Sequence, residues 1–235
     1  HHHLAMKTTE SNHSALRNLK WAEYAIDALV LAGVRDCVIC PGARSSALVL
    51  AAYARQDALT LCVHYDERGA TFFAMGLATG SGRPVAVVTT SGSAVANTLP
   101  AVVEASLSHV PLIIVSADRP PELRDTCANQ AIDQTQILSP HTRWFFDFPC
   151  PSGDVNASRF VGSTVQHAVA RATGIDAGPV HLNFMFREPL VPSAEEWGSR
   201  TSAALELPST ATDAQAACAG AIAPPNTLAA VAAAH

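Results

Sequence analysis

The chain has 235 residues, of which 49% are hydrophobic and only 15% are charged, and its formal net charge is −5 at pH 7. High hydrophobicity with little charge excludes an intrinsically disordered chain, and a mildly acidic chain with scattered basic residues argues against nucleic acid as a partner. No stretch approaches the roughly 18 apolar residues that a membrane-spanning helix needs. Because no secretory signal stands near the start either, we expect a cytoplasmic protein with no membrane span.

Three segments of different character divide the sequence. Residues 1–5 (HHHLA) have the composition of a purification-tag remnant, and a native start is expected at Met6. Residues 6–191 predict one α/β domain. Residues 192–235 are rich in Ser, Thr and Ala, which predicts a linker and the start of a central domain that the chain does not contain. A disordered natural tail is the alternative for this last segment.

Strands and helices are expected to alternate along the domain. Short runs of Val, Ile, Leu and aromatic residues predict six strands, at Cys37–Cys40, Leu61–Tyr65, Val85–Thr89, Leu112–Ser116, Trp144–Phe148 and Val180–Phe184. Amphipathic stretches predict helices, at Ala15–Ala32, Ser45–Arg55, Asp66–Ala78, Gly92–Leu107 and Ser158–Ala172, with a short one opened by Pro120-Pro121. Gly33 is expected to end the first helix, since glycine tolerates the left-handed conformation common at that position.

The predicted strands are continuous apolar runs rather than alternating ones, which is typical of a parallel sheet buried on both faces. Strand–helix–strand repetition with short loops then predicts right-handed crossovers and a doubly wound, six-stranded parallel α/β domain with helices on both faces. Ligands of such sheets bind outside the carboxyl ends of the strands. The residues that follow each strand are therefore the candidates for a functional site.

Cysteine spacing does not predict a metal or disulfide site. Cys37 and Cys40 form a CxxC motif, but residues three apart on a strand point to opposite faces and cannot hold one ion or pair with each other. They are expected to be small buried residues in a reducing compartment. The histidines show no paired ligand spacing, so no metal ligand is assigned in this chain.

Two glycine-containing turns lead from strands into helices. The turn after the first strand reads Pro41-Gly42-Ala43-Arg44, where N–H groups of a helix start and the fork of Arg44 favour a carboxylate or phosphate. A simple tight connection is the alternative. After the third strand, Gly92 and Ser93 offer N–H and hydroxyl groups to a flat polar ligand.

A carboxylate pair follows the second strand. Asp66 is expected to cap the next helix, with Glu67 in its favourable first turn. Alternatively, Glu67 lies in a cleft at the strand's carboxyl end, where a buried carboxyl would have a raised pKa and could share a proton with a ligand nitrogen.

The fourth strand is followed by a second arginine. Arg119 and Arg44 are expected to project from neighbouring strand ends toward one crevice, with the amides of Asn129 and Gln130 nearby. Two arginines suit a small polyanionic acid. An ion pair of Arg119 with Asp118 or Glu122 is the structural alternative.

Four segments together carry a family resemblance: CPGARSS, YDERG, TTSGSAVAN and SADRPPELRDTCANQAIDQ, in this order after successive strands. They resemble the thiamine-diphosphate-dependent synthases of menaquinone and phylloquinone biosynthesis, the 2-succinyl-5-enolpyruvyl-6-hydroxy-3-cyclohexene-1-carboxylate synthases. The resemblance covers roughly Trp21 to Leu190 and corresponds to the first of three α/β domains, the one that binds the aminopyrimidine ring.

The resemblance implies roles for individual residues. Glu67 would hydrogen-bond the pyrimidine ring and promote its imino tautomer, and Gly92 and Ser93 would line the turn beside that ring. Arg44, Arg119, Asn129 and Gln130 would hold the carboxylates of 2-oxoglutarate, isochorismate and their adducts. Thiamine diphosphate would act as the electron sink for decarboxylation and addition.

The sequence also departs from the family pattern. Ala43 stands where the family has serine, and Thr126-Cys127 stands where Cys-Gly is common. The family's diphosphate- and Mg²⁺-binding domain is absent, and its site forms between subunits. By this resemblance, the absent domain implies a fragment that is inactive alone, and the shared site implies a full-length parent that is a homo-oligomer, either a dimer or a tetramer.

Two other functions are also consistent with the sequence. Another thiamine-diphosphate carboligase or decarboxylase, related to acetolactate synthase, would use pyruvate, although Ser93-Ala94 stands where those enzymes have Pro-Gly. A non-catalytic α/β module would instead bind a dicarboxylate tightly on its own.

Overall fold

The computed structural model describes residues 2–193 and 196. The described domain ends at Ser193. Apart from its first two residues and Glu196, the segment expected to form a linker lies outside the described residues.

Six parallel strands form one sheet in the order β2-β1-β3-β4-β6-β5. Their bounds are β1 Asp36–Ile39, β2 Thr60–Val63, β3 Val85–Thr89, β4 Leu112–Asp118, β5 Trp144–Phe148 and β6 Val180–Met185. Every residue of β3, β4 and β6 is buried, as expected for strands covered on both faces. The predicted doubly wound α/β fold is confirmed.

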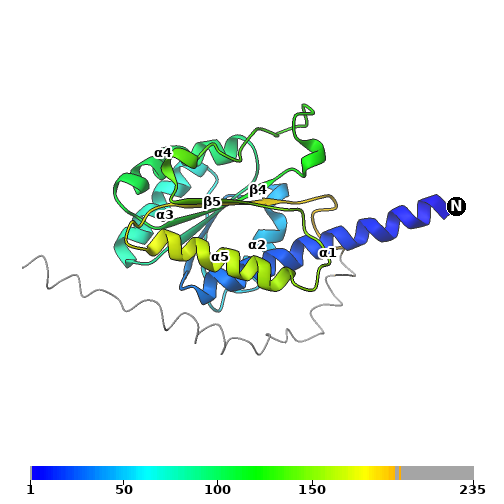
Figure 1. Cartoon of the computed structure of the whole chain (residues 1–235), viewed down its shortest axis with the longest axis horizontal. Helices are drawn as coiled ribbons and strands as arrows, with labels where there is room; N and C mark the ends of the chain where they lie inside the picture. The colour runs from blue at the N-terminus through cyan, green and yellow to red at the C-terminus, as the bar shows by residue number, and fades with distance from the viewer. Residues whose placement is uncertain (1, 194–195, 197–235) are drawn as a thin grey trace, which may run out of the picture. The chain divides into compact units, whose positions relative to one another are not determined.

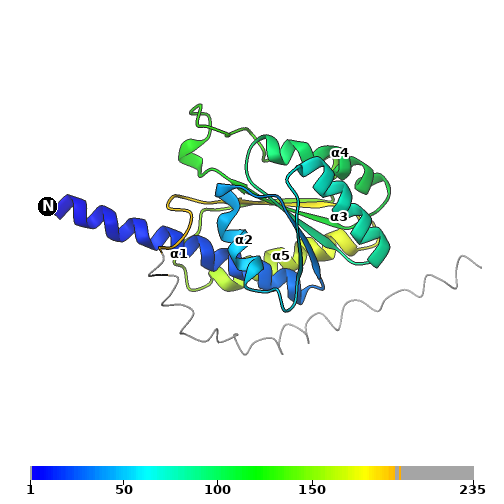
Figure 2. The ribbon, with the colours of Figure 1, turned by 180° about the vertical axis from the view of Figure 1, so that it is seen from behind.

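Five α-helices within the described residues cover the two faces of the sheet: α1 His2–Leu31, α2 Ser46–Tyr53, α3 Glu67–Ser81, α4 Ser93–Leu107 and α5 Ala157–Thr173. Helix α1 packs against α2 and α5 on one face, while α3 and α4 pack together on the other (Figures 1 and 2). Short 3-10 helices, η1 Ala43–Ser45, η2 Pro121–Leu123 and η3 Ser139–His141, lie in the connections. The segment between β4 and β5, which contains η2 and η3, extends beyond the sheet (Figure 1).

Helix α1 begins at His2, well before the predicted start at Ala15. The sequence of α1 contains neither proline nor glycine, so no residue between His2 and Ala15 interrupts the helix. The helix therefore includes residues that were expected to be a tag remnant. At its other end Gly33 has φ +96° and the Val34 N–H donates to the Leu29 carbonyl, which confirms the predicted glycine terminus.

Local sequence explains how α3 begins and packs. The Asp66 carboxylate accepts hydrogen bonds from the Arg68 and Gly69 N–H groups, so Asp66 is the expected N-cap. Ala70, Ala74 and Ala78 follow at four-residue spacing and are all buried, because alanine lets the helix approach the sheet closely.

The side chains of β1 alternate between the two cores. Cys37 and Ile39 pack on the face covered by α1, α2 and α5, whereas Val38 and Cys40 pack on the face covered by α3 and α4. Burial raises the pKa of each of these two thiols to about 12. The prediction that the CxxC cysteines point to opposite faces is confirmed.

Candidate active site at the carboxyl edge of the sheet

The turns after β1 and β3 touch each other and shape the base of the site. Gly42 lies so close to Thr90 that a Cβ on the glycine would be 2.3 Å from the Thr90 Cβ. The Ser45 hydroxyl donates to the Gly42 carbonyl at 3.0 Å and closes the turn. Glycine is therefore required here by a close approach between two turns.

Arg44 extends from η1 to the segment that follows β6. Its side chain is 7% exposed, and its Nη1 donates to the Phe186 carbonyl at 2.9 Å. Nη2 donates to Glu188 Oε1 at 3.0 Å. Nε is buried and has no hydrogen-bond acceptor among the residues that the structure describes.

Arg119 follows β4 and is 9% exposed. Its Nη1 donates to the Ser91 hydroxyl, and its backbone N–H donates to Asp118 Oδ1 at 2.7 Å. Burial, and then the positive charge of Arg44, lower the pKa of Arg119. The two arginines are thus close enough to repel each other in a poorly solvated position, which favours an anion between them.

The strands that carry the two arginines are not neighbours, so that part of the expectation is wrong. β3 lies between β1 and β4 in the sheet, and Ser91 after β3 contacts Arg119. The arginines approach each other because Arg44 reaches toward the end of β6, which is the other neighbour of β4.

The expected ion-pair partners of Arg119 are engaged elsewhere. Arg187 binds Glu122 through two hydrogen bonds of 2.6 and 2.9 Å, and Arg124 Nη2 binds Asp118 Oδ2 at 2.7 Å. Among the described residues, the contact of the Arg119 guanidinium is with Ser91. Arg119 is therefore free of the structural ion pairs considered above, although the charge of Asp118 is close enough to oppose the lowering of the Arg119 pKa.

Gln130 and Asn129 are both exposed, and Gln130 joins this cluster through its hydrogen bond to Ser91. The side-chain amide of Gln130 donates to the Ser91 carbonyl at 3.0 Å. The backbone carbonyl oxygen of Gln130 lies 2.8 Å from where a Cβ of Gly92 would be. Gly92 has φ +78° and is the glycine before Ser93, the exposed first residue of α4. The loop can approach the turn because glycine has no side chain.

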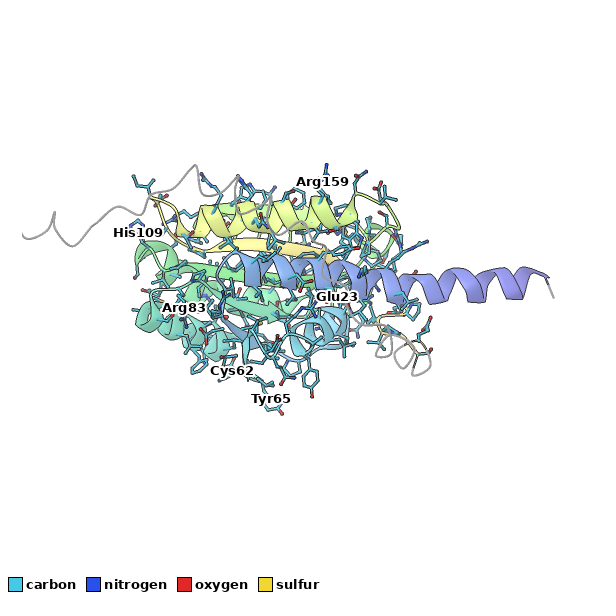
Figure 3. The ribbon with its side chains drawn as sticks, turned by 90° about the horizontal axis from the view of Figure 1, so that it is seen from below. Glu23, Cys62, Tyr65, Arg83, His109 and Arg159 are labelled. Atoms are coloured by element: carbon cyan, nitrogen blue, oxygen red, sulfur yellow. The ribbon has the colours of Figure 1, made fainter. Side chains whose placement is uncertain are left out.

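Glu67 lies on the α3–α4 side of the site, apart from the arginine cluster. It is half-buried rather than buried, and its Oε2 accepts a hydrogen bond from Asn97 of α4 at 3.4 Å. Its charge is close enough to Cys40 to contribute to the raised pKa of that thiol. Tyr65, two residues earlier, is 87% exposed and projects from the β2 edge (Figure 3).

Sequence reasoning missed a buried side chain that holds the site together. Gln134 is fully buried; its Oε1 accepts from the Gly92 N–H at 2.9 Å, and its Nε2 donates to the Ala117 carbonyl and to Asn183 Oδ1. It therefore links the turn after β3 to the ends of β4 and β6. Its place in the segment ANQAIDQ gave the only signal of its importance.

A buried polar network continues from Gln134 into the sheet. The Asn183 amide donates to Asp118 Oδ2 at 2.9 Å and to Asp147 Oδ1 at 2.8 Å, and Arg124 binds both carboxylates. On the other side, the Ser116 hydroxyl bonds Asn183 Oδ1 and the His181 ring, each at 2.7 Å. This network attaches the segment between β4 and β5 to the sheet.

Two searches of the described residues bear on cofactors and location. Within residues 2–193 and 196, no group of three or more His, Cys, Asp or Glu side chains is placed to hold a metal ion. None of the helices in that same part of the chain is both long enough and apolar enough to cross a bilayer.

Comparisons with known proteins give the family. Residues 19–137 match the family described as thiamine pyrophosphate enzyme, N-terminal TPP binding domain. A 2-succinyl-5-enolpyruvyl-6-hydroxy-3-cyclohexene-1-carboxylate synthase of Chloroflexus aurantiacus is 53% identical over 172 residues, which is 73% of this chain and 29% of that protein. Proteins of the same name from Rubrobacter xylanophilus and Halobacterium salinarum are 49% and 47% identical, over 74% and 75% of this chain and 30% of each relative.

The chain thus spans about 30% of the length of the curated relatives that it matches. The matched region includes both arginines, Glu67 and the loop with Gln130. The chain therefore belongs to the thiamine pyrophosphate enzymes, as an N-terminal TPP binding domain.

Proposed function

We propose that the chain is the pyrimidine-binding part of a synthase that decarboxylates 2-oxoglutarate and adds the resulting four-carbon unit to isochorismate. The observation that carries the proposal is the pair of buried guanidiniums, Arg44 and Arg119, at the carboxyl edge of the sheet. Two adjacent cations with little solvent favour a substrate with several carboxylates. The names of the relatives support the same reaction.

The residues near Glu67 fit an aminopyrimidine ring. A half-buried carboxylate oriented by Asn97 can accept from, or share a proton with, a ring nitrogen. When bound, thiamine diphosphate supplies the electron sink for decarboxylation of a 2-oxo acid and for carbon–carbon bond formation. Glu67 would hold the proton at its carboxyl group, and Gly92 and Ser93 would border the ring.

The arginines would position the substrates rather than react with them. Arg119 is oriented by Ser91 and Arg44 by the Phe186 carbonyl, so both forks are fixed before a substrate binds. Prior orientation reduces the entropy that binding must remove. Gln130, and the exposed Asn129 beside it, would add neutral hydrogen bonds to the same carboxylates.

The remainder of the full-length protein would complete the site. We assign the residues that bind Mg²⁺ and the diphosphate group to that remainder, and we expect a cytoplasmic homo-oligomer. The 235-residue chain alone should then show no turnover.

The test follows the loss of isochorismate absorbance with the full-length protein that contains this chain. Consumption should require 2-oxoglutarate, thiamine diphosphate and Mg²⁺, each of which is omitted in turn. Glu67→Gln keeps the side-chain shape but loses the ionisable proton, so the rate should fall by at least about 100-fold. Arg68→Gln, on the next residue of α3, is the control and should retain activity.

Consumption of pyruvate instead of 2-oxoglutarate would replace this proposal with the acetolactate-type reaction. Tight binding of a dicarboxylate by the 235-residue chain, with no turnover in the full-length protein, would replace it with the binding module.

A further inference from the structure

The fork of Arg44 is only half occupied. Nε and Nη2 lie on the same edge of a guanidinium and together match the two oxygens of a carboxylate. Nη2 is bound to Glu188 Oε1 at 3.0 Å, whereas Nε is buried and lacks an acceptor within the described part of the chain. A buried N–H donor without a partner is unfavourable, so the edge favours a carboxylate that contacts both nitrogens.

The two members of this ion pair differ strongly in exposure. The Arg44 side chain is 7% exposed and is held by the Phe186 carbonyl, whereas the Glu188 side chain is 71% exposed. An ion pair with so exposed a partner contributes little stability. Glu188 can therefore rotate into solvent while Arg44 stays in place.

The backbone around Glu188 is fixed, so that only its side chain is available to move. The buried amide of Asn18 donates to the Arg187 carbonyl at 2.7 Å and to the Pro189 carbonyl at 3.3 Å. These contacts attach the residues on both sides of Glu188 to α1.

The charges around the pair leave Glu188 as the carboxylate that can be exchanged. The positive charge of Arg44 lowers the pKa of Arg119. The negative charges of Asp118 and Glu188 act on that pKa in the opposite direction. Asp118 is buried and is bound by Arg124 and Asn183. If Glu188 moves away, the site gains net positive charge toward a ligand.

We propose that Glu188 is an exchangeable counterion of Arg44, which occupies the fork in the empty domain and which a ligand carboxylate displaces in order to contact Nε and Nη2 together. Glu188 then acts through Arg44 as a residue that sets anion affinity. The inference rests on the proposed function for the identity of the anion. The exchange is measured by binding, without turnover. Failure of the exchange can therefore be distinguished from failure of the proposed function.

The experiment titrates 2-oxoglutarate into the 235-residue chain and follows the arginine Nε–H signals by NMR, with the Arg44 signal assigned by its loss in Arg44→Met. Glu188→Gln removes the competing charge, and the dissociation constant should fall about fivefold. The Arg44 Nε–H signal should move further at saturation than in a titration with chloride. Glu188→Ala should change the affinity in the same direction.

Glu122→Gln is the matched control, because Glu122 is another exposed carboxylate and is bound to Arg187 of the same segment. It should leave the dissociation constant within about twofold. In the Arg44→Met background, Glu188→Gln should have no effect, as a double-mutant cycle requires. Equal or weaker binding by both Glu188 variants, or no binding by any of the proteins, would overturn the exchange.

Discussion

At the scale of single residues, Gln134 has more structural consequence than its neutral side chain suggests. Its amide pairs with the Gly92 N–H, the Ala117 carbonyl and Asn183 Oδ1, all in the interior. Gln134→Leu keeps the approximate volume but removes three buried hydrogen bonds, including the one that the Gly92 N–H donates, so it should lower the free energy of unfolding by about 3 kcal/mol. Urea denaturation of the 235-residue chain measures the change.

Gln136 provides the control for this prediction, because it lies on the same loop with an exposed side chain. Gln136→Leu should alter the free energy of unfolding by less than about 0.5 kcal/mol. Equal effects of the two substitutions would mean that the loop is not attached through the Gln134 amide.

Cys127 stands at a position whose backbone conformation suits glycine. It has φ +56°, a left-handed conformation in which glycine carries no steric cost, and glycine is the residue expected there from the family resemblance. Asp125 and Gln130 share this conformation, at φ +58° each. This part of the loop is therefore built from residues in an unfavourable backbone conformation, which the contacts of Gln130 and Gln134 help to maintain.

At the scale of elements, the contact between the turns after β1 and β3 can be tested with one methyl group. Gly42→Ala would place a Cβ 2.3 Å from the Thr90 Cβ, so one of the two turns must shift. We expect the free energy of unfolding to fall by about 1–3 kcal/mol, as for other overpacked sites. Because Arg44 starts from the same turn, the NMR titration with 2-oxoglutarate should also show weaker binding.

Gly76→Ala is the matched substitution. Gly76 lies in α3, and a Cβ there would have no heavy atom within 4 Å. Alanine has the higher helix propensity, so this variant should gain about 1 kcal/mol and keep its anion affinity. A destabilised Gly76→Ala together with an unchanged Gly42→Ala would contradict the described packing.

The elements themselves were largely predictable from the sequence. β3 and β5 have the predicted bounds, and the remaining strands differ by one or two residues at their ends. Continuous apolar runs, and glycines at the ends of helices, determine these elements locally, as the end of α1 before Gly33 illustrates. The order of strands was not predictable in this way, because it depends on packing between distant segments. The error about Arg44 and Arg119 followed from that limit.

At the scale of the whole molecule, the predictable part of the site is the part that follows strands directly. Arg44, Glu67 and Arg119 come after β1, β2 and β4, at the strand ends where the rule for parallel sheets places a ligand. Their partners do not follow from this rule, because the contact of Arg44 with Phe186 joins residues 142 positions apart, and that of Gly92 with Gln134 joins residues 42 apart. Local patterns carry no information about such pairs until the fold brings them together.

The buried polar network makes the stability of the whole domain dependent on pH through His181. This ring is 1% exposed, bonds the Ser116 hydroxyl through Nε2 and packs against Phe145. Burial lowers the pKa of His181 from 6.5 to about 3, although the charge of Asp147 opposes the shift. Below pH 6.5 the unfolded chain takes up a proton that the folded chain does not bind until about pH 3. The stability that depends on neutral His181 is therefore fully present above pH 6.5, and it is lost as the pH falls from there toward 3.

Between pH 7.5 and pH 5 this difference should lower the free energy of unfolding by about 2 kcal/mol. The carboxyl of Glu122, whose pKa is lowered by its hydrogen bond to Arg187, loses its contribution below its ordinary value of 4.5, outside this range. Urea denaturation at several pH values measures the slope. His181→Gln should flatten it even if the variant is less stable throughout, because the slope depends only on proton uptake. His141→Gln, at a half-buried loop position, should keep the slope, and a slope that survives His181→Gln would assign it to another group.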